Sequence, residues 1–211
     1  MEIVSFDELS STQLYLIDKI KSKEYKPPIA IITDNQTKGI GSRDNCWIAN
    51  KGDLLFSLAL KIDSLPSDLP LESVSIYFAY LLKEVLYKYD KNIFLKWPND
   101  FYIADKKIGG CVTKLIDDTI IVGIGINLVS KNSEFGYLNI DKKPQKLLVE
   151  FIDLVEKFPS WKYIFSKYQV EFNLSKNFYV HINGEQKSLK NAILCSDGSI
   201  EIENKKVYSL R

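Results

Sequence analysis

The chain has 211 residues, of which 45% are hydrophobic and 26% are charged, a composition that is ordinary for a folded globular protein. Its 28 basic and 27 acidic residues leave a formal net charge of +1. This balance argues against a disordered chain and against a general nucleic-acid binder.

The three cysteines lie far apart and form no CxxC pair, which argues against a disulfide framework or a zinc site and indicates reduced thiols. The longest apolar run, residues 120–128, is too short to cross a bilayer. The first residues lack the basic and apolar regions of a secretory signal. We therefore expect a cytoplasmic protein with no membrane partner.

The first fifty residues predict a helix, a strand and a long loop. After a short apolar stretch at residues 3–6, a Ser-Ser-Thr run at residues 10–12 can cap a helix, which a Pro-Pro pair later ends. The apolar face of this helix holds Leu14, Ile17 and Ile20. Residues 29–33 have the pattern of a buried strand. Residues 34–52 are polar and show no period, and a loop of this length is usually functional.

Residues 53–127 predict strands around one long helix. A strand at residues 53–62 comes first, and apolar residues then recur at three- and four-residue steps from 71 to 89, as in an amphipathic helix of about five turns. The strands expected after the helix are residues 93–97, 101–103, 108–115 and 119–127. A Pro-Asn-Asp turn, residues 104–107 and an Asp-Asp hairpin turn join them.

In the last third of the chain the sequence pattern changes from that of helices to that of strands. Residues 144–173 have helical spacing, and Pro159 divides them into two helices. The strands expected beyond them are residues 178–182, 187–194, 200–203 and 207–210, with Asn-Gly and Asp-Gly as hairpin signals. We therefore expect a main domain at residues 1–173 and a small β-barrel-like unit at residues 174–211.

The loop that begins at Gln36 combines glycines with positive charge. Gly39 and Gly41 let backbone N–H groups approach an anion closely, and Lys38 and Arg43 add charge. The glycine spacing is neither that of a dinucleotide loop nor that of a P-loop. The residues thus indicate either a phosphate or carboxylate loop or a mobile surface loop.

A second segment, Lys96-Trp97-Pro98-Asn99-Asp100, places a cation, an amide and a carboxylate at the end of a strand. Carboxylate and amide oxygens are ligands that hard cations such as Mg²⁺ prefer. The same residues fit a capped turn equally well.

Two further segments, residues 106–110 (KKIGG) and 123–127 (GIGIN), carry glycines inside strands. Glycine weakens a strand and often marks the close approach of a ligand. A β-bulge flanked by solvated lysines is the alternative for the first segment. Together, the two strands favour a slot with flat walls.

These segments, in this order, resemble the motifs of the biotin protein ligases. Residues 96–100 match the family's KWPND in full, residues 107–110 resemble K-[IL]-[AG]-G, and residues 123–127 resemble G-[IA]-G-[IL]-N. Ser11-Thr12-Gln13 resembles an early S-T-N with glutamine for asparagine, and the closing Ser-Leu-Arg also resembles the family's end. The resemblance covers nearly the whole chain. It is to the short form without a DNA-binding domain, so no DNA partner is expected.

The glycine-rich loop departs from the family's G-R-G-R-x-G-R/N-x-W pattern. Ile40 and Ser42 stand in place of two arginines and Asp44 in place of the third glycine. Arg43 and Trp47 occupy positions where these residues also occur in family loops. The departures affect the loop's usual role, which is to close over biotin and the adenylate.

The resemblance implies an α+β fold, with a mixed, mainly antiparallel sheet packed with helices as in class II aminoacyl-tRNA synthetases and biotin ligases. A small C-terminal SH3-like β-barrel would complete it. The implied activity is that of an ATP-dependent ligase that forms biotinyl-5′-adenylate with Mg²⁺. The biotin is then transferred to a lysine of a biotin carboxyl carrier protein, such as that of acetyl-CoA carboxylase. The family includes homodimers and monomers, so a homodimer is an open alternative.

The resemblance also assigns roles to residues. Lys107 is the expected catalytic cation, lying against the biotin carboxylate and the α-phosphate. The residues expected to bind biotin are Ser11, Thr12, Gln13, Gln36, Gly39, Ile40, Gly41, Ser42, Lys107, Gly109, Gly110, Gly123 and Gly125. Those expected to contact ATP are Lys38, Arg43, Trp47, Lys96, Asn99 and Asn127, and those expected to hold Mg²⁺ are Asp100 and Asn127.

Two other functions remain open at this point. Lipoate and octanoate protein ligases share the fold but lack the KWPND motif. A protein that binds biotin or its adenylate without transferring it is the second alternative, which the altered loop favours. Pyrophosphate release that depends on both biotin and ATP separates the enzyme from the binder, and replacing biotin by lipoate separates the two ligases.

Overall fold

The computed structural model describes residues 1–41, 46–129 and 135–209. Its centre is a seven-stranded sheet in the order β1-β2-β5-β9-β8-β7-β6. In that order the strands are β1 (Glu2–Leu9), β2 (Ile29–Gln36), β5 (Leu54–Lys61), β9 (Thr119–Ile126), β8 (Lys106–Ile116), β7 (Asp100–Ile103) and β6 (Ile93–Lys96). The β1–β2 pair is parallel and the other neighbouring pairs are antiparallel.

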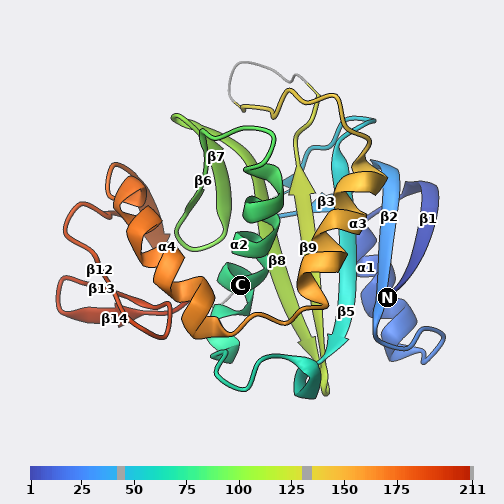
Figure 1. Cartoon of the computed structure of the whole chain (residues 1–211), viewed down its shortest axis with the longest axis horizontal. Coiled ribbons are helices and arrows are strands. Elements are labelled where there is room, and N and C mark those ends of the chain that lie inside the picture. The colour runs from blue at the N-terminus through green and yellow to red at the C-terminus, as the bar shows by residue number, and fades with distance from the viewer. Residues whose placement is uncertain (42–45, 130–134, 210–211) are drawn as a thin grey trace.

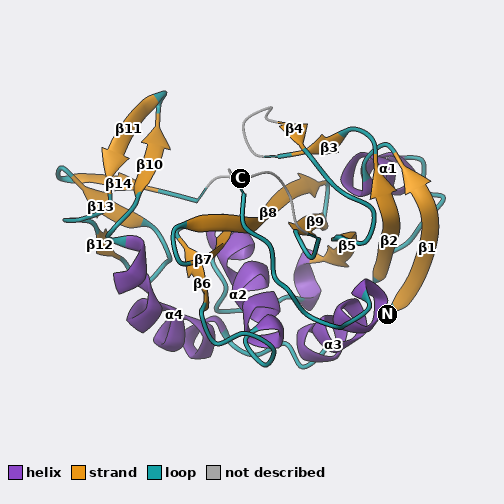
Figure 2. Ribbon diagram, turned by 90° about the horizontal axis from the view of Figure 1, so that it is seen from above, coloured by secondary structure: helices purple, strands orange, loops and turns teal. Residues whose placement is uncertain are grey.

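Helices cover the two faces of the sheet unequally. Figure 2 shows α2 (Val74–Leu86), α3 (Pro144–Val155) and α4 (Trp161–Ser175) on one face and α1 (Thr12–Lys21) on the other. Two short 3₁₀ turns, η1 (Ile62–Ser64) and η2 (Leu71–Ser73), precede α2. Nearly every residue of α2 is buried, so this helix lies at the centre of the main core. It packs on the sheet with α3 on one side and α4 on the other (Figure 1 and Figure 2).

The C-terminal residues form two small sheets beside α4 (Figure 1). One pairs β10 (Tyr179–Ile182) with β11 (Glu185–Ser188), and the other holds β12 (Ile193–Leu194), β13 (Ile200–Ile202) and β14 (Lys205–Val207). Their buried side chains, including Val180 and Ile200, belong to the same apolar core as α2. The indole Nε1 of Trp97 donates to the carbonyl of Gly198 at 2.9 Å. The C-terminal sheets are thus packed directly against the Lys96–Asp100 segment.

The structure confirms the expected fold class and corrects four details. Residues 34–52 were expected to lack strands, but β2 extends to Gln36. A hairpin of β3 (Gly39–Ile40) and β4 (Cys46–Trp47) follows. Each of its strands is two residues long, too short to produce a period in the sequence. The other three corrections concern the start of β8, the strand expected at residues 187–194 and the last strand of the chain.

Lys106 and Lys107 were expected in a connection but belong to β8. The single strand expected at residues 187–194 is two strands, because a turn closed by the Ala192 N–H and the Leu189 carbonyl at 3.0 Å separates them. The last strand, expected at residues 207–210, is β14, which begins two residues earlier. Glu203 and Asn204 take positive φ values of 51° and 59° and make the turn.

No helix among the described ranges has both the length and the apolar character that a membrane span requires.

Candidate functional site

A pocket opens on the sheet face opposite α2, α3 and α4, under the β3–β4 hairpin and the start of α1 (Figure 2). The residues that line it are Ser11, Thr12, Gln13, Gln36, Ile40, Gly41, Trp47, Asn99, Asp100, Lys107, Gly110, Cys111, Val112, Gly123, Ile124 and Gly125. Thirteen of these were expected from the sequence to bind biotin, ATP or Mg²⁺. Segments from the first and the second hundred residues therefore meet at one place.

The floor of the pocket is flat because three of its strand positions are glycines, Gly110 of β8 and Gly123 and Gly125 of β9. Gly110 of β8 lies between Asp100 of β7 and Gly125 of β9. A Cβ on Gly125 would lie 2.8 Å from Trp47 Nε1, and a Cβ on Gly123 would lie 2.8 Å from Gln13 Oε1. Neither position can carry a side chain without displacing the residue above it.

One end of the pocket is polar and already hydrogen-bonded. The Thr12 hydroxyl donates to Gln36 Oε1 at 3.1 Å, and the backbone N–H of Thr12 donates to the same oxygen at 2.7 Å. Ser57, beneath them on β5, donates to the Thr12 hydroxyl at 2.9 Å. These groups are buried or partly buried, so a ligand that breaks these bonds without replacing them would bind at a cost.

A β-bulge brings Lys107 into the pocket. Gly109 pairs with Phe101 and Lys107 pairs with Tyr102, so that Ile108 is an extra residue in β8. In a regular strand Lys107 and Gly110, three positions apart, would face opposite sides of the sheet. The extra residue reverses the alternation, and both residues line the pocket.

Three charged side chains converge at this end of the floor. Lys107 Nζ lies 2.6 Å from Asp100 Oδ1, and Lys96 Nζ lies 3.7 Å from Asp100 Oδ2. The side chains of Lys96 and Asp100 are 11% and 14% exposed and that of Lys107 is 28% exposed. Burial, and then the charge of Asp100, raises the pKa of the neighbouring Tyr102 to about 12, so its phenol stays protonated at neutral pH.

Two asparagines near these charges have side-chain oxygens that are buried and accept no hydrogen bond from any residue the structure describes. Asn99 Nδ2 donates to the Cys111 carbonyl, and its Oδ1 is left for a ligand of the pocket. Asn127 Nδ2 donates to the Gly136 carbonyl at 3.0 Å. Asn127 thereby holds residues 136–138 against β8, and it does not line the pocket.

The residues beside Asp100 fit a magnesium ion of the kind that accompanies a nucleotide. Within the described part of the chain there is no group of three or more His, Cys, Asp or Glu that could form an all-protein metal site. Mg²⁺ is commonly bound by one or two carboxylates together with substrate phosphates and water. Asp100 supplies the carboxylate, and the unpaired Asn99 Oδ1 is a further hard oxygen ligand.

Several expected site residues lie elsewhere. Lys38 and Gly39 line an adjacent groove on the outer side of the β3–β4 hairpin. Gly109 points to the core face, where a Cβ would meet Phe101 and Ile126. Lys96 does not line the pocket, and its ammonium lies 3.7 Å from Oδ2 of Asp100, which does. Ser42 and Arg43 lie outside the described residues.

The sequence-based list missed Cys111, Val112 and Ile124, which also line the pocket. The register of β8 after its bulge would have indicated Val112, since it pairs with Gly123. Burial raises the pKa of the Cys111 thiol well above its usual range. Cys111 therefore stays a neutral thiol, and its side chain belongs to the apolar core.

Comparison with known protein families gives one match. Residues 5–128 match the model described as "Biotin/lipoate A/B protein ligase family". Among curated proteins, the bifunctional ligase/repressor BirA of Escherichia coli is 30% identical over 138 residues, which are 62% of this chain and 42% of that protein. The chain thus spans less than half the length of this relative.

Comparison with solved structures supports the same relationship. The biotin acetyl coenzyme A carboxylase synthetase of Helicobacter pylori, solved with bound biotinylated ATP, is 42% identical and superimposes with a TM-score of 0.94 over 98% of this chain and 99% of that one. The biotin protein ligase of Aquifex aeolicus, in complex with biotin and ATP, has a TM-score of 0.76 at 22% identity over 100% and 96% of the two chains. The latter similarity is one of fold.

Proposed function

The chain belongs to the biotin/lipoate A/B protein ligase family, and from this premise we propose that it activates biotin with ATP and transfers it to a lysine of a biotin carboxyl carrier protein. One observation carries the proposal. A single pocket combines a flat floor of glycines, a polar end formed by Thr12 and Gln36, and an ion pair between Lys107 and Asp100. The close similarity to a synthetase solved with biotinylated ATP supports it.

The shape and polarity of the pocket suit biotin. Its ureido ring presents two N–H donors and one carbonyl, which would pair with the buried polar groups of Ser11, Thr12 and Gln36. A dithiolane ring, as in lipoate, offers neither N–H nor carbonyl groups to this polar end, and a site built for hydrogen bonding favours the ligand that supplies them. The bicycle and tail would lie along Gly110, Gly123 and Gly125.

The reaction has two steps. An oxygen of the biotin carboxylate attacks the α-phosphorus of ATP and pyrophosphate leaves, which gives biotinyl-5′-adenylate. The uncharged amine of the carrier lysine then attacks the acyl carbon, the bond to the phosphate oxygen breaks, and AMP leaves. A carboxylate is a poor acyl donor, and adenylation makes its oxygen part of a good leaving group.

Lys107 addresses the difficulty of the first step, in which two anions must meet. Its ammonium would face both the carboxylate and the α-phosphate, and its contact with Asp100 at 2.6 Å would keep it directed there. A fixed cation that faces charge developing in the transition state lowers the barrier without reorganising during the reaction. We assign Lys107 as the catalytic residue and Lys96 and Asn99 to the nucleotide.

Asp100 and Asn99 would hold the magnesium ion, which when bound neutralises phosphate charge. Asp100 also contacts Lys107 at 2.6 Å, so the same carboxylate would direct the ammonium toward the substrate oxygens.

The replacement Lys107→Ala tests the proposal. We expect biotin-dependent pyrophosphate release from ATP to fall by about 100- to 1000-fold, because a single preorganised charge commonly supplies that much. The helical content and the melting temperature should stay near those of the parent, because Lys107 is partly exposed and its ion pair lies at the pocket.

The matched control is Lys114→Ala, an exposed lysine of the same strand, which should retain parental activity. Lipoate in place of biotin should give no pyrophosphate release. Near-parental turnover by Lys107→Ala, or release that is equal with lipoate, would contradict the proposal.

A further inference from the structure

The strand that leads into the Lys96–Asp100 segment lies at the open edge of the sheet, yet side chains of α4 satisfy its outward backbone groups. β6 is the last strand in the sheet order, and its inner edge pairs with β7. The N–H of Leu95 donates to Glu171 Oε1 at 2.7 Å, and the N–H of Trp97 donates to Ser175 Oγ at 3.0 Å. A helix thus takes the place of a neighbouring strand.

The two acceptors are placed by the helix itself. Glu171 and Ser175 are four residues apart on α4 and therefore lie on one face of it, one turn above the other. Alternate residues of an antiparallel strand direct their N–H groups to the same side, so Leu95 and Trp97 match this spacing. Ser175 is fully buried and the Glu171 side chain is 11% exposed, so water competes little for either bond.

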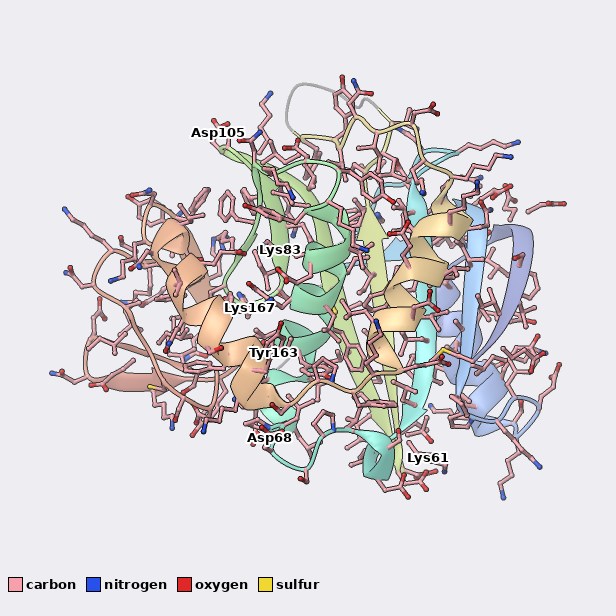
Figure 3. The ribbon with its side chains drawn as sticks, in the orientation of Figure 1. Lys61, Asp68, Lys83, Asp105, Tyr163 and Lys167 are labelled. Atoms are coloured by element: carbon pink, nitrogen blue, oxygen red, sulfur yellow. The ribbon has the colours of Figure 1, made fainter. Side chains whose placement is uncertain are left out.

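A second helix fixes Glu171. Its carboxylate forms an ion pair with Lys83 of α2, whose side chain is 5% exposed, and Figure 3 shows Lys83 in the space between α2 and α4. The Lys83 ammonium also lies 5.0 Å from the ring centre of Tyr80 and 4.5 Å from that of Tyr87. The carboxylate therefore has little freedom to leave Leu95.

The hydrogen bonds of the Leu95 and Trp97 N–H groups lie on either side of Lys96, at the charged end of the pocket. Lys96 lies between Leu95 and Trp97 and pairs across the strands with Asp100. Asp100 in turn contacts Lys107 at 2.6 Å. A shift of β6 along or away from the sheet would move Lys96 and the turn that carries Asn99 and Asp100.

We infer that Glu171 and Ser175 are positioning residues for adenylation, which hold β6 so that Lys96, Asn99 and Asp100 meet the nucleotide; this rests on the proposed function. The competing explanation is that the same contacts only protect an open edge strand from pairing with another chain. The two explanations differ in what happens to turnover when the protein remains folded.

A matched pair of double variants separates them. Lys83→Met with Glu171→Gln removes the ion pair but keeps an amide oxygen that can accept from Leu95. Lys83→Met with Glu171→Leu removes the ion pair and the acceptor. We expect kcat for biotin-dependent pyrophosphate release to be about tenfold lower in the leucine variant than in the glutamine variant, since small misplacements of reacting groups are costly. KM for biotin should differ little, because the floor and the polar end lie on other strands.

The control for an apolar substitution on the same helix is Gln169→Leu, at an exposed position of α4, which should behave as the parent. Exchange of the Leu95 amide hydrogen should be slow in the glutamine variant and faster in the leucine variant. If the leucine variant does not fold, Ser175→Ala takes its place, with a loss of kcat at unchanged KM for biotin expected.

Equal kcat in the two double variants, with active parent protein, would overturn the inference and leave edge protection as the role of Glu171. An inactive parent would instead refute the proposed function. The two failures are therefore distinct.

Discussion

At the scale of single residues, the site depends on glycine positions that have no room for a side chain. Gly123 and Gly125 leave room for Gln13 and Trp47, which lie directly above them. Gly110 is different, because a Cβ there would meet Asp100 and Lys107 at 3.5 and 3.7 Å, which is ordinary contact. The floor therefore has a sensitive half under Trp47 and a tolerant half beside the charges.

From these two halves we expect alanine to weaken biotin binding by different factors at Gly125 and at Gly110. In Gly125→Ala the indole of Trp47 must move, since its Nε1 and Cε2 would lie 2.8 and 2.9 Å from the new Cβ. We expect biotin to bind at least about tenfold more weakly and the fluorescence of the protein to change. Isothermal titration with biotin measures the first effect.

Gly110→Ala is the companion variant and should weaken biotin binding by a smaller factor. Equal loss in both variants, or no loss in Gly125→Ala, would show that the floor beneath Trp47 is not where the ligand lies.

At the scale of the elements, α4 begins on a carboxylate supplied from outside the helix. Asp68 accepts from the N–H groups of Trp161 and Lys162 at 3.0 and 2.9 Å. Burial acts to raise the pKa of Asp68, but these two N–H groups outweigh it, and the pKa lies below its ordinary value of 3.8. Ser160 Oγ caps the same helix by accepting from the Tyr163 N–H at 3.2 Å. Asp68 adds to this cap for the helix that carries Glu171 and Ser175, and it accepts most strongly while it is ionised.

Asp68→Ala should destabilise the protein by about 1 kcal/mol at pH 7, as the loss of a helix cap usually does, or by about 2–4 °C in melting temperature. Because the folded pKa is the lower one, the stabilisation is complete above the unfolded pKa and is lost as pH falls through the folded value. The difference in melting temperature between the parent and Asp68→Ala should therefore be smaller at pH 3 than at pH 7.

The control for Asp68→Ala is Asp153→Ala, an exposed position of α3, which should leave the melting temperature unchanged at both pH values. A difference in melting temperature between the parent and Asp68→Ala that is larger at pH 3 than at pH 7 would contradict the capping role.

The elements also show what the sequence could reveal. The apolar steps from Leu71 to Tyr89 predicted α2 because a buried helix repeats its pattern over many residues. The glycines at residues 109 and 110 suggested a β-bulge as an alternative, but the sequence does not show that Ile108 is the extra residue. Without that register, the sequence cannot show that Gly109 faces the core and that Val112 lines the pocket. The acceptors for β6 come from α4, about 76 residues away in sequence, and no local pattern shows such a pairing.

At the scale of the whole molecule, the C-terminal sheets and the main sheet share one core. The turn at Gly198 is one point of close contact between them. Its carbonyl accepts from Trp97, its φ is +80°, and a Cβ there would overlap Ser73 Oγ. The division at residues 173 and 174 remains a prediction, and the shared core leads us to expect one cooperative unfolding transition.

Gly198→Ala tests this contact. The left-handed φ alone costs about 1–2 kcal/mol, and the overlap with Ser73 adds to it. Gly184→Ala isolates the first contribution, because Gly184 has a φ of +85° and no atom within 4 Å of its Cβ position. Calorimetry should show a single transition in both variants, with the larger fall in melting temperature for Gly198→Ala.

Equal shifts in these two variants would mean that the turn is free to move away from Ser73. Two separate transitions would mean that the C-terminal sheets fold independently of the main sheet.

The activity of the whole molecule is tested most directly by the intact mass of a purified biotin carboxyl carrier domain after incubation with the protein, biotin and Mg·ATP. We expect a gain of one biotinyl group, which disappears when ATP is omitted and forms about 100- to 1000-fold more slowly when Lys107→Ala replaces the parent. No gain in mass, with biotin still bound by the protein, would contradict transfer and leave a biotin-binding protein in its place.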